Sequence, residues 1–197
     1  MGIIFDILGS FIVRAAIVGI LLQLMITMSD ALYRYTERVA LNDDIISVAH
    51  VISSDLKNVG YKTYKGFYTV TSSSSNTDVR FAVDSNSTTG IIVYIRYYLS
   101  SAYSAPYSHL KSINRDSIYG STTVNTLEVA RNVSRFRFNF YDASGVSTTI
   151  TTAGVIRSVN VNIEMDSKDK LVGVIDKASN VTAQKVSWEQ QFFPENL

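Results

Sequence analysis

The stretch that decides the fold is residues 1–28, which read MGIIFDILGSFIVRAAIVGILLQLMITM. They contain 20 apolar side chains and only two charged ones, Asp6 and Arg14, whereas the other 169 residues carry 33 charges. About 20 apolar residues are enough to span a bilayer as a helix. A secretory signal peptide would begin with basic residues, and none precedes Arg14. The stretch therefore predicts a helix that lipid or other protein covers.

The two charges in this stretch need partners or a route to water. A charge at the centre of a lone membrane helix costs roughly 2.5–3.5 kcal/mol on insertion scales. In one interpretation Asp6 lies near the positive end of the helix dipole and Arg14 reaches toward the interface. In the other, the helix packs among copies of itself, and Asp6 of one copy meets Arg14 of another. The two residues lie eight positions apart, about 12 Å along one helix, which is too far for an easy pair within the chain.

The helix is expected to continue beyond the apolar stretch. Residues 29–59 contain neither glycine nor proline. Gly60 suits a helix C-terminus, and Lys57 suits the last turn. Apolar residues recur mostly at steps of three, four or seven, which predicts an amphipathic helix over 29–60 with one stripe packed on the following domain. The stripe consists of Leu32, Tyr35, Val39, Ile46, Ile52, Leu56 and Val59, with Ala49 beside them.

Residues 61–197 have a different composition. They hold 34 serines and threonines and many short β-type runs. The clearest run is 136–141, FRFNFY, which alternates with period two and is followed by the turn sequence Asp-Ala-Ser-Gly at 142–145. Further strands are predicted at 67–71, 79–83, 91–99, 146–152, 155–165, 171–175 and 181–193. The chain is therefore predicted to be α+β: a long N-terminal helix packed on an antiparallel β-sheet head domain.

The composition also excludes several classes of function. The chain has no cysteine, so it has no disulfide scaffold, thiolate metal site or cysteine nucleophile. Its net charge of +1 gives no field for binding nucleic acid. Its only two histidines, His50 and His109, belong to no recognisable catalytic pattern, and Asp166 and Asp169 among lysines suggest a solvated turn rather than a calcium loop. We expect no enzymatic activity, no cofactor and no metal.

These features together resemble the type IV pilin superfamily. The resemblance rests on the long apolar helix, its amphipathic continuation, the sequence SDLKNVGY at 54–61 and the Ser/Thr-rich β domain. It is greatest to minor pilins and to the larger minor pseudopilins of type II secretion, which often end this helix with an acidic-Leu-basic-x-x-Gly-Tyr motif. A segment like 133–141, the turn from Asp142 to Gly145 and a strand like 156–161 are also typical of them.

The resemblance implies a structural subunit of an extracellular, pilus-like helical filament. Such a subunit waits in the inner membrane and is packed by pilus or secretion machinery among identical subunits, with apolar helices in the core and β-rich heads outside. Residues 1–28 would then be the transmembrane or filament-core helix. The alternative is a membrane-anchored, pseudopilin-like protein or a tip or adhesin subunit that binds a ligand. We expect the assembly surface to comprise Phe5, Asp6, Phe11, Arg14, Ile17, Leu21 and Leu24.

The sequence departs from the family pattern at its start. The family has a short basic leader ending in glycine, followed by phenylalanine and an early glutamate, and nothing like this is present. The sequence is therefore expected to be either already mature or an unprocessed, divergent relative. Asp6 could stand in for the family's early glutamate, which neutralises a neighbour's N-terminal amine, although its position does not match closely.

Two further features suit a surface protein. Asn86, Asn132 and Asn180 begin N-x-Ser/Thr sequons, which could carry glycans, although three sequons are no more than chance would give in this composition. Five tyrosines between 94 and 107 are expected to pack in strands and subunit contacts, with an adhesive surface as the alternative.

Overall fold

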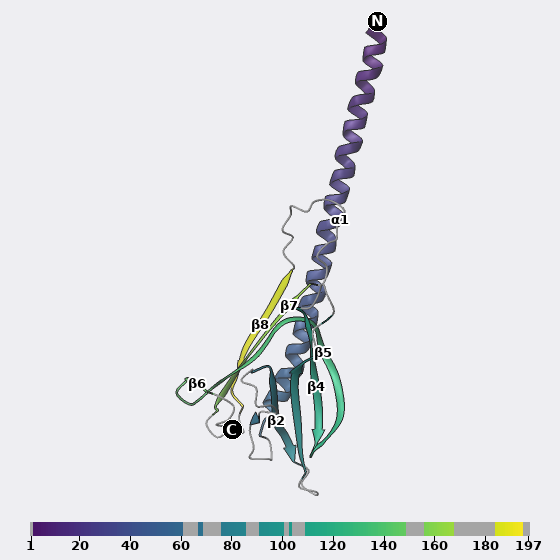
Figure 1. Ribbon diagram of the computed structural model, residues 1–197. Coiled ribbons are helices and arrows are strands. Elements are labelled where there is room, and N and C mark those ends of the chain that lie inside the picture. Colours follow the sequence, from purple (N-terminus) through teal and green to yellow (C-terminus); the bar gives the residue numbers. More distant parts are fainter. Residues whose placement is uncertain are drawn as a thin grey trace. The chain divides into compact units, whose positions relative to one another are not determined.

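A computed structural model describes residues 2–60, 67–68, 76–85, 91–100, 103, 109–148, 156–167 and 184–194. Its one helix, α1, spans Gly2–Lys57, close to the predicted limits (Figure 1). The chain forms two compact units, Met1–Ala40 and Leu41–Leu197. The boundary between them lies within α1, whereas the composition changes at residues 28 and 60.

The helix ends where the sequence predicted. Lys57 is its last residue, and Gly60 follows with φ of 76°, a conformation that glycine adopts without steric cost. The Gly60 N–H donates to the Ala82 carbonyl at 2.9 Å. This bond joins the end of the helix to the sheet within the second unit.

The described residues of the second unit form one antiparallel sheet of eight strands. Seven of them follow the order β1-β2-β3-β4-β5-β7-β8, and β6 pairs with β5 beside this path (Figure 1). The strands are β1 (Phe67–Tyr68), β2 (Asp78–Ser85), β3 (Ile92–Leu99), β4 (Lys111–Tyr119), β5 (Thr122–Tyr141), β6 (Ser147–Thr148), β7 (Ser158–Asp166) and β8 (Lys185–Phe192).

The long strand β5 joins the two halves of the sheet. Its first half pairs with β4, and its second half, from Val133 to Tyr141, pairs with β7. The halves meet at Asn132, which has φ of 57° and lies at a register shift against β4. Asparagine is one of the few residues that tolerates this left-handed conformation, so a bulge forms where the strand changes partners.

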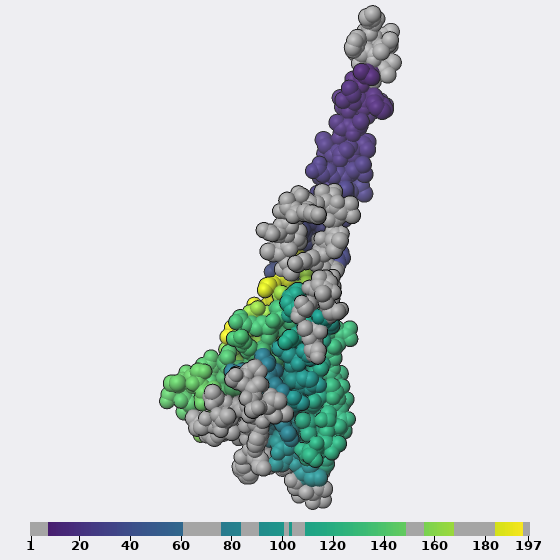
Figure 2. Space-filling view, viewed as in Figure 1, coloured from purple at the N-terminus to yellow at the C-terminus, as the bar shows by residue number. Residues whose placement is uncertain are grey.

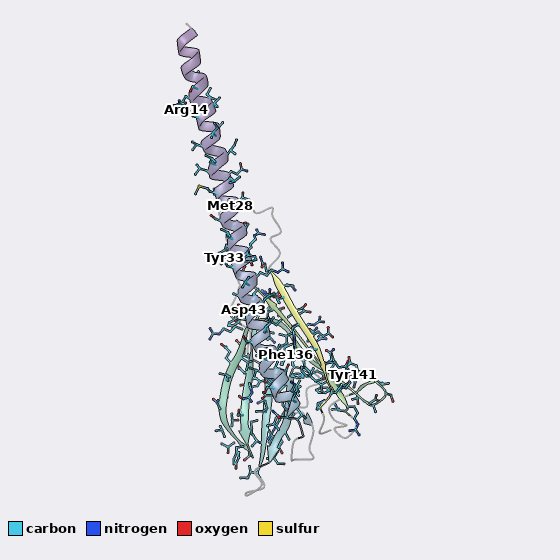
Figure 3. The ribbon with its side chains drawn as sticks, turned by 180° about the vertical axis from the view of Figure 1, so that it is seen from behind. Arg14, Met28, Tyr33, Asp43, Phe136 and Tyr141 are labelled. Atoms are coloured by element: carbon cyan, nitrogen blue, oxygen red, sulfur yellow. The ribbon has the colours of Figure 1, made fainter. Side chains whose placement is uncertain are left out.

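The core of the second unit lies between the sheet and residues 41–59. Phe136, Phe138 and Phe140 alternate along β5 and are at most 1% exposed, as their period-two pattern predicted. The Phe136 and Phe138 rings meet edge to face, with centroids 5.0 Å apart. Figure 3 shows Phe136 behind the helix in this layer. This packing confirms a helix on an antiparallel sheet.

Several strands match their predictions and others do not. The runs 79–83, 91–99, 136–141 and 155–165 fall on β2, β3, the end of β5 and β7. Residues 171–175 lie outside the described residues, as do parts of four other predicted strands. The sequence missed β4 and the first half of β5. The turn at 142–145 is confirmed: Gly145 has φ of 75°, and the Asp142 carboxylate accepts hydrogen bonds from the Ser144 and Val146 amides.

Candidate assembly surface and the helix–sheet contact

The first part of α1 presents apolar side chains to solvent on every side. From Leu8 to Met28, each large apolar side chain is at least 51% exposed in the single chain (Figure 2). Among the described residues, α1 is the one helix that is long and apolar enough to cross a membrane, and none of its apolar window is buried. A helix that is apolar all round is normally covered, by a core or by lipid. This surface therefore requires another apolar environment.

The predicted assembly residues lie on this surface. Phe11 is 71% exposed, and Ile17, Leu21 and Leu24 are each more than half exposed. Phe5 and Asp6 are in the helix, but their side chains lie outside those that the structure describes. Arg14 is exposed on the same helix (Figure 3), and none of the ion pairs between described side chains includes it.

The apolar stripe that packs on the sheet is displaced from the predicted one. Ile52, Leu56 and Val59 are fully buried in the core, but the prediction for Ile46 is wrong, because that side chain is 52% exposed. Its neighbour Ile45 is buried instead. The buried positions of the stripe are Leu41, Ile45, Val48, Ala49, Ile52, Leu56 and Val59.

The displacement follows from helix geometry. An α-helix has 3.6 residues per turn, so a stripe that is extended from one end in steps of seven residues drifts around the helix axis. Extending the pattern from Leu32 selects Ile46, whereas extending it back from Val59 selects Ile45. Leu32, Tyr35 and Val39 belong to the first unit and are 61%, 67% and 40% exposed. Their packing on the head stays a prediction.

A partly buried ionic cluster fastens the end of α1 to the sheet. The Asp55 carboxylate accepts hydrogen bonds from Arg115 Nε at 2.6 Å, Arg115 Nη2 at 3.0 Å and the Tyr97 hydroxyl at 2.5 Å. Arg115 also donates from Nη1 to the Ser117 hydroxyl at 3.0 Å. A two-pronged arginine–carboxylate pair fixes orientation as well as distance. The acidic residue of the SDLK motif is therefore a structural contact between helix and sheet.

This cluster shifts the pKa of both partners of Asp55. Burial, followed by the charge of Asp55, raises the pKa of the Tyr97 hydroxyl well above its ordinary range. The hydrogen bond to Asp55 raises the pKa of Arg115, against a smaller opposing effect of burial. The cluster therefore holds a protonated phenol and a charged guanidinium.

The architecture has a known counterpart. The structure is similar to that of a type IV-like pilin from Thermus thermophilus, with a TM-score of 0.57 at 12% sequence identity. The match covers 80% of this chain and 98% of that one. The chain has a type IV pilin-like fold. No protein-family model and no curated protein matches the sequence, so the likeness is carried by the fold.

The tyrosines of this pilin-like head take different roles. Tyr97 is fully buried, and its ring stacks on Phe81 with centroids 6.1 Å apart. Tyr94 precedes the buried Ile95, and Tyr98 follows the buried Tyr97. The Arg80 guanidinium lies over the Tyr94 ring, and the Arg96 guanidinium lies over the Tyr98 ring. Tyr107 lies outside the described residues. Strand packing accounts for these three described rings.

Among the described residues, the remaining polar candidates show no catalytic or metal-binding arrangement, and Asp169 lies outside those residues. No group of three His, Cys, Asp or Glu side chains in the described part of the chain could hold a metal ion. Asp166 does not belong to a solvated turn: it is 4% exposed, accepts a hydrogen bond from Ser134 and lies 3.6 Å from the Lys185 ammonium. Its partners come from other strands, so the local sequence did not indicate its burial.

Of the three sequons, the structure describes only the one at Asn132. That residue occupies the bulge of β5, and its side-chain oxygen is buried. The need for a left-handed conformation is a sufficient reason for asparagine at this position. Asn86 and Asn180 lie outside the described residues.

Proposed function

We propose that this protein is a structural subunit of an extracellular, pilus-like helical filament of identical subunits. The apolar part of α1 would bundle with its copies in the filament core, and the sheet domain would form the outer surface. Before assembly the same helix would anchor the subunit in the inner membrane, where pilus or secretion machinery would receive it. The filament is proposed to be non-enzymatic.

The observation that carries this proposal is the exposed apolar helix on a pilin-like fold. Burying one Val, Leu, Ile or Phe side chain contributes about 1.5–3 kcal/mol relative to leaving it in water. Residues 8–28 leave such side chains exposed on all faces, so both a bilayer and a bundle of copies satisfy them. Head-to-tail contacts that do not close extend into fibres.

Within that bundle, Asp6 is proposed to pair with Arg14 of a neighbouring subunit. They are the only charges among the first 28 residues, and each would be costly in an apolar core without a partner. Pairing across subunits would offset adjacent helices by about 12 Å, the rise of eight residues. The pair would then set the axial register of the filament.

Electron microscopy of the purified protein, with and without detergent, tests the filament. Fibres are expected once detergent is removed, and dispersed particles under every condition would contradict the proposal. Particles of that kind would favour the membrane-anchored or filament-tip alternative.

Charge variants test the register contact separately. Asp6→Ala and Arg14→Ala are each expected to reduce the assembled fraction at least tenfold, and the exchanged double variant Asp6→Arg/Arg14→Asp is expected to restore much of it. Thermal unfolding of the head serves as the control and should stay unchanged. Normal filaments from both single variants would refute the pairing while leaving the filament itself intact.

A further inference from the structure

A second apolar stripe on α1 lies outside the contact with the sheet. It consists of Leu32, Tyr35, Val39 and Ile46, which are 61%, 67%, 40% and 52% exposed in the single chain. The sheet is contacted through other residues of the helix, such as Ile45, which is 3% exposed. The described part of the chain therefore leaves much of this exposed stripe in water.

The exposed stripe has the spacing of a coiled coil. With Leu32 at position a of a heptad, Tyr35 falls at d, and Val39 and Ile46 fall at a of the next two heptads. Apolar residues at a and d keep one seam facing a partner helix when two helices wind around each other. Residues 8–28 are apolar on every side and favour no single seam, so the spacing is informative only beyond them.

The seam has a clear end. The next d position after Ile46 is Ala49, which is 7% exposed and belongs to the stripe that packs on the sheet. Between Leu32 and Ile46 the one polar residue at an a or d position is Asn42. A partner helix can therefore follow α1 to about Ile46 and must separate from it there.

The charges beside the exposed stripe are complementary between two parallel copies. In a parallel coiled coil with its helices in register, position g of one helix lies beside position e of the next heptad in the other. Arg38 occupies g and Asp43 occupies that e position (Figure 3). Both side chains are exposed, and neither has an ion-pair partner among the described residues. Two copies would form the Arg38–Asp43 pair twice, once on each side of the seam.

A second copy of the chain suits this surface better than lipid does. Residues 29–46 carry six charges, which the hydrocarbon core of a bilayer does not accept. Two copies that are anchored in one membrane by residues 1–28 have parallel helices and a high local concentration. Parallel orientation is the one in which Arg38 and Asp43 meet across the seam.

We propose that the exposed stripe forms the seam of a parallel, in-register dimer of the membrane-anchored subunit, flanked by two Arg38–Asp43 pairs. The dimer rests on the membrane anchoring proposed above, and it would cover the stripe in place of the head contact predicted from the sequence. The filament contact between Asp6 and Arg14 offsets neighbouring helices by about 12 Å. The dimer would therefore open before its subunits enter a filament.

Single-cysteine variants of the full chain in phosphatidylcholine vesicles test the seam, because the protein has no cysteine of its own. Leu32→Cys, Tyr35→Cys and Val39→Cys are each oxidised, and the exposed Ala40→Cys, one position away, is the matched control. A disulfide requires Cβ atoms about 3.5–4.5 Å apart, so a residue crosslinks to its own copy only where two helices are in register. We expect disulfide-linked dimers to be at least tenfold more abundant at the seam positions than at Ala40→Cys.

Two results of this experiment would overturn the proposal. One is the absence of seam disulfides, or their equal abundance at Ala40→Cys. The other comes from mixing Leu32→Cys subunits with Val39→Cys subunits. Disulfides that form mainly between the two variants, and not within either, would show helices offset by one heptad.

Charge reversal tests the flanking pairs. Arg38→Asp and Asp43→Arg are introduced separately into Val39→Cys, and one of the two proteins carries a longer affinity tag. Each variant alone places like charges on both sides of the seam, whereas a mixed dimer places opposite charges on both sides. We expect mixed dimers to exceed either homodimer at least fivefold. Equal yields of all three dimers would refute the Arg38–Asp43 contact and the register that depends on it.

Flotation of the protein with the vesicles measures the anchoring separately. Protein that floats but shows no seam disulfide would refute the dimer and leave the proposed anchoring intact. Protein that does not float would refute the anchoring and the dimer together. Fibres seen by electron microscopy in the absence of seam disulfides would refute the dimer alone.

Discussion

The two parts of α1 have the same backbone structure but opposite relations to solvent. Residues 41–57 bury one apolar stripe against the sheet of their own chain, and their remaining faces are polar or half exposed. Residues 8–28 are apolar around the whole circumference and have nothing described in the chain to cover them. One part is therefore covered by the fold of its own chain, whereas the described residues leave the other uncovered, although helix propensity alone does not distinguish them.

The largest effect is expected from the same substitution in the two regions. Phe138→Ala removes a fully buried ring from the core of the head, and large-to-small changes of this kind cost about 3–5 kcal/mol. Phe11→Ala removes a ring that is 71% exposed, so it should leave head unfolding within about 0.5 kcal/mol of the wild type. Urea unfolding in detergent, followed by the fluorescence of the single tryptophan, Trp188, measures both.

The control for this comparison is filament yield, which should be lowered by Phe11→Ala even though the head is intact. Equal destabilisation of the head by the two variants would contradict the division into a self-sufficient unit and an association surface.

A second pair of variants sharpens the comparison within two helical turns. Ile52→Ala is expected to destabilise the head by about 3 kcal/mol, because Ile52 is fully buried in the core. Ile46→Ala, at 52% exposure, should cost less than about 1 kcal/mol. The same urea titration measures both variants. A loss for Ile46→Ala as large as that for Ile52→Ala would restore the stripe predicted from the sequence, which contains both residues.

The accuracy of the sequence predictions depended on how local each signal was. The helix limits, the Phe136–Phe140 alternation and the turn at Gly145 are local patterns, and each was confirmed. Strand β4, KSINRDSIY, has few apolar residues and no clear alternation, because two of its buried positions hold the polar residues Asp116 and Ser112, whose partners are distant in the sequence. Its existence could not be inferred from its own residues.

The helix–sheet cluster was missed for the same reason. Asp55 stood in a motif noted in the sequence, but its partner Arg115 lies 60 residues away on a strand that had not been predicted. No periodicity links two such positions. The apolar stripe was misassigned at Ile46 because adjacent isoleucines fit two stripes equally well, and only the position of the sheet chooses between them.

The smallest predicted effect concerns that cluster and appears only in alkaline solution. Burial and Asp55 raise the pKa of Tyr97 in the folded protein, whereas in the unfolded chain it ionises near its ordinary value of about 10. Below pH 10 both states keep the proton, so the contribution of Tyr97 to stability is fully present. Above it the unfolded state loses the proton first, and the free energy of unfolding should fall by about 1.4 kcal/mol per pH unit.

Tyr97→Phe isolates this dependence, because the other tyrosines remain as a common background in both proteins. The variant loses one hydrogen bond to a charged acceptor, a cost of about 1.5–2 kcal/mol near neutral pH, while Arg115 still holds Asp55. It also lacks the alkaline loss attributed to Tyr97. The difference in stability between the two proteins should therefore shrink above pH 10 and vanish about 1 to 1.5 pH units higher. Urea midpoints at each pH measure this difference, and parallel pH profiles would show that Tyr97 ionises with the same pKa in both states. That result would mean that the Tyr97 hydroxyl does not contribute to the contact between the helix and the sheet.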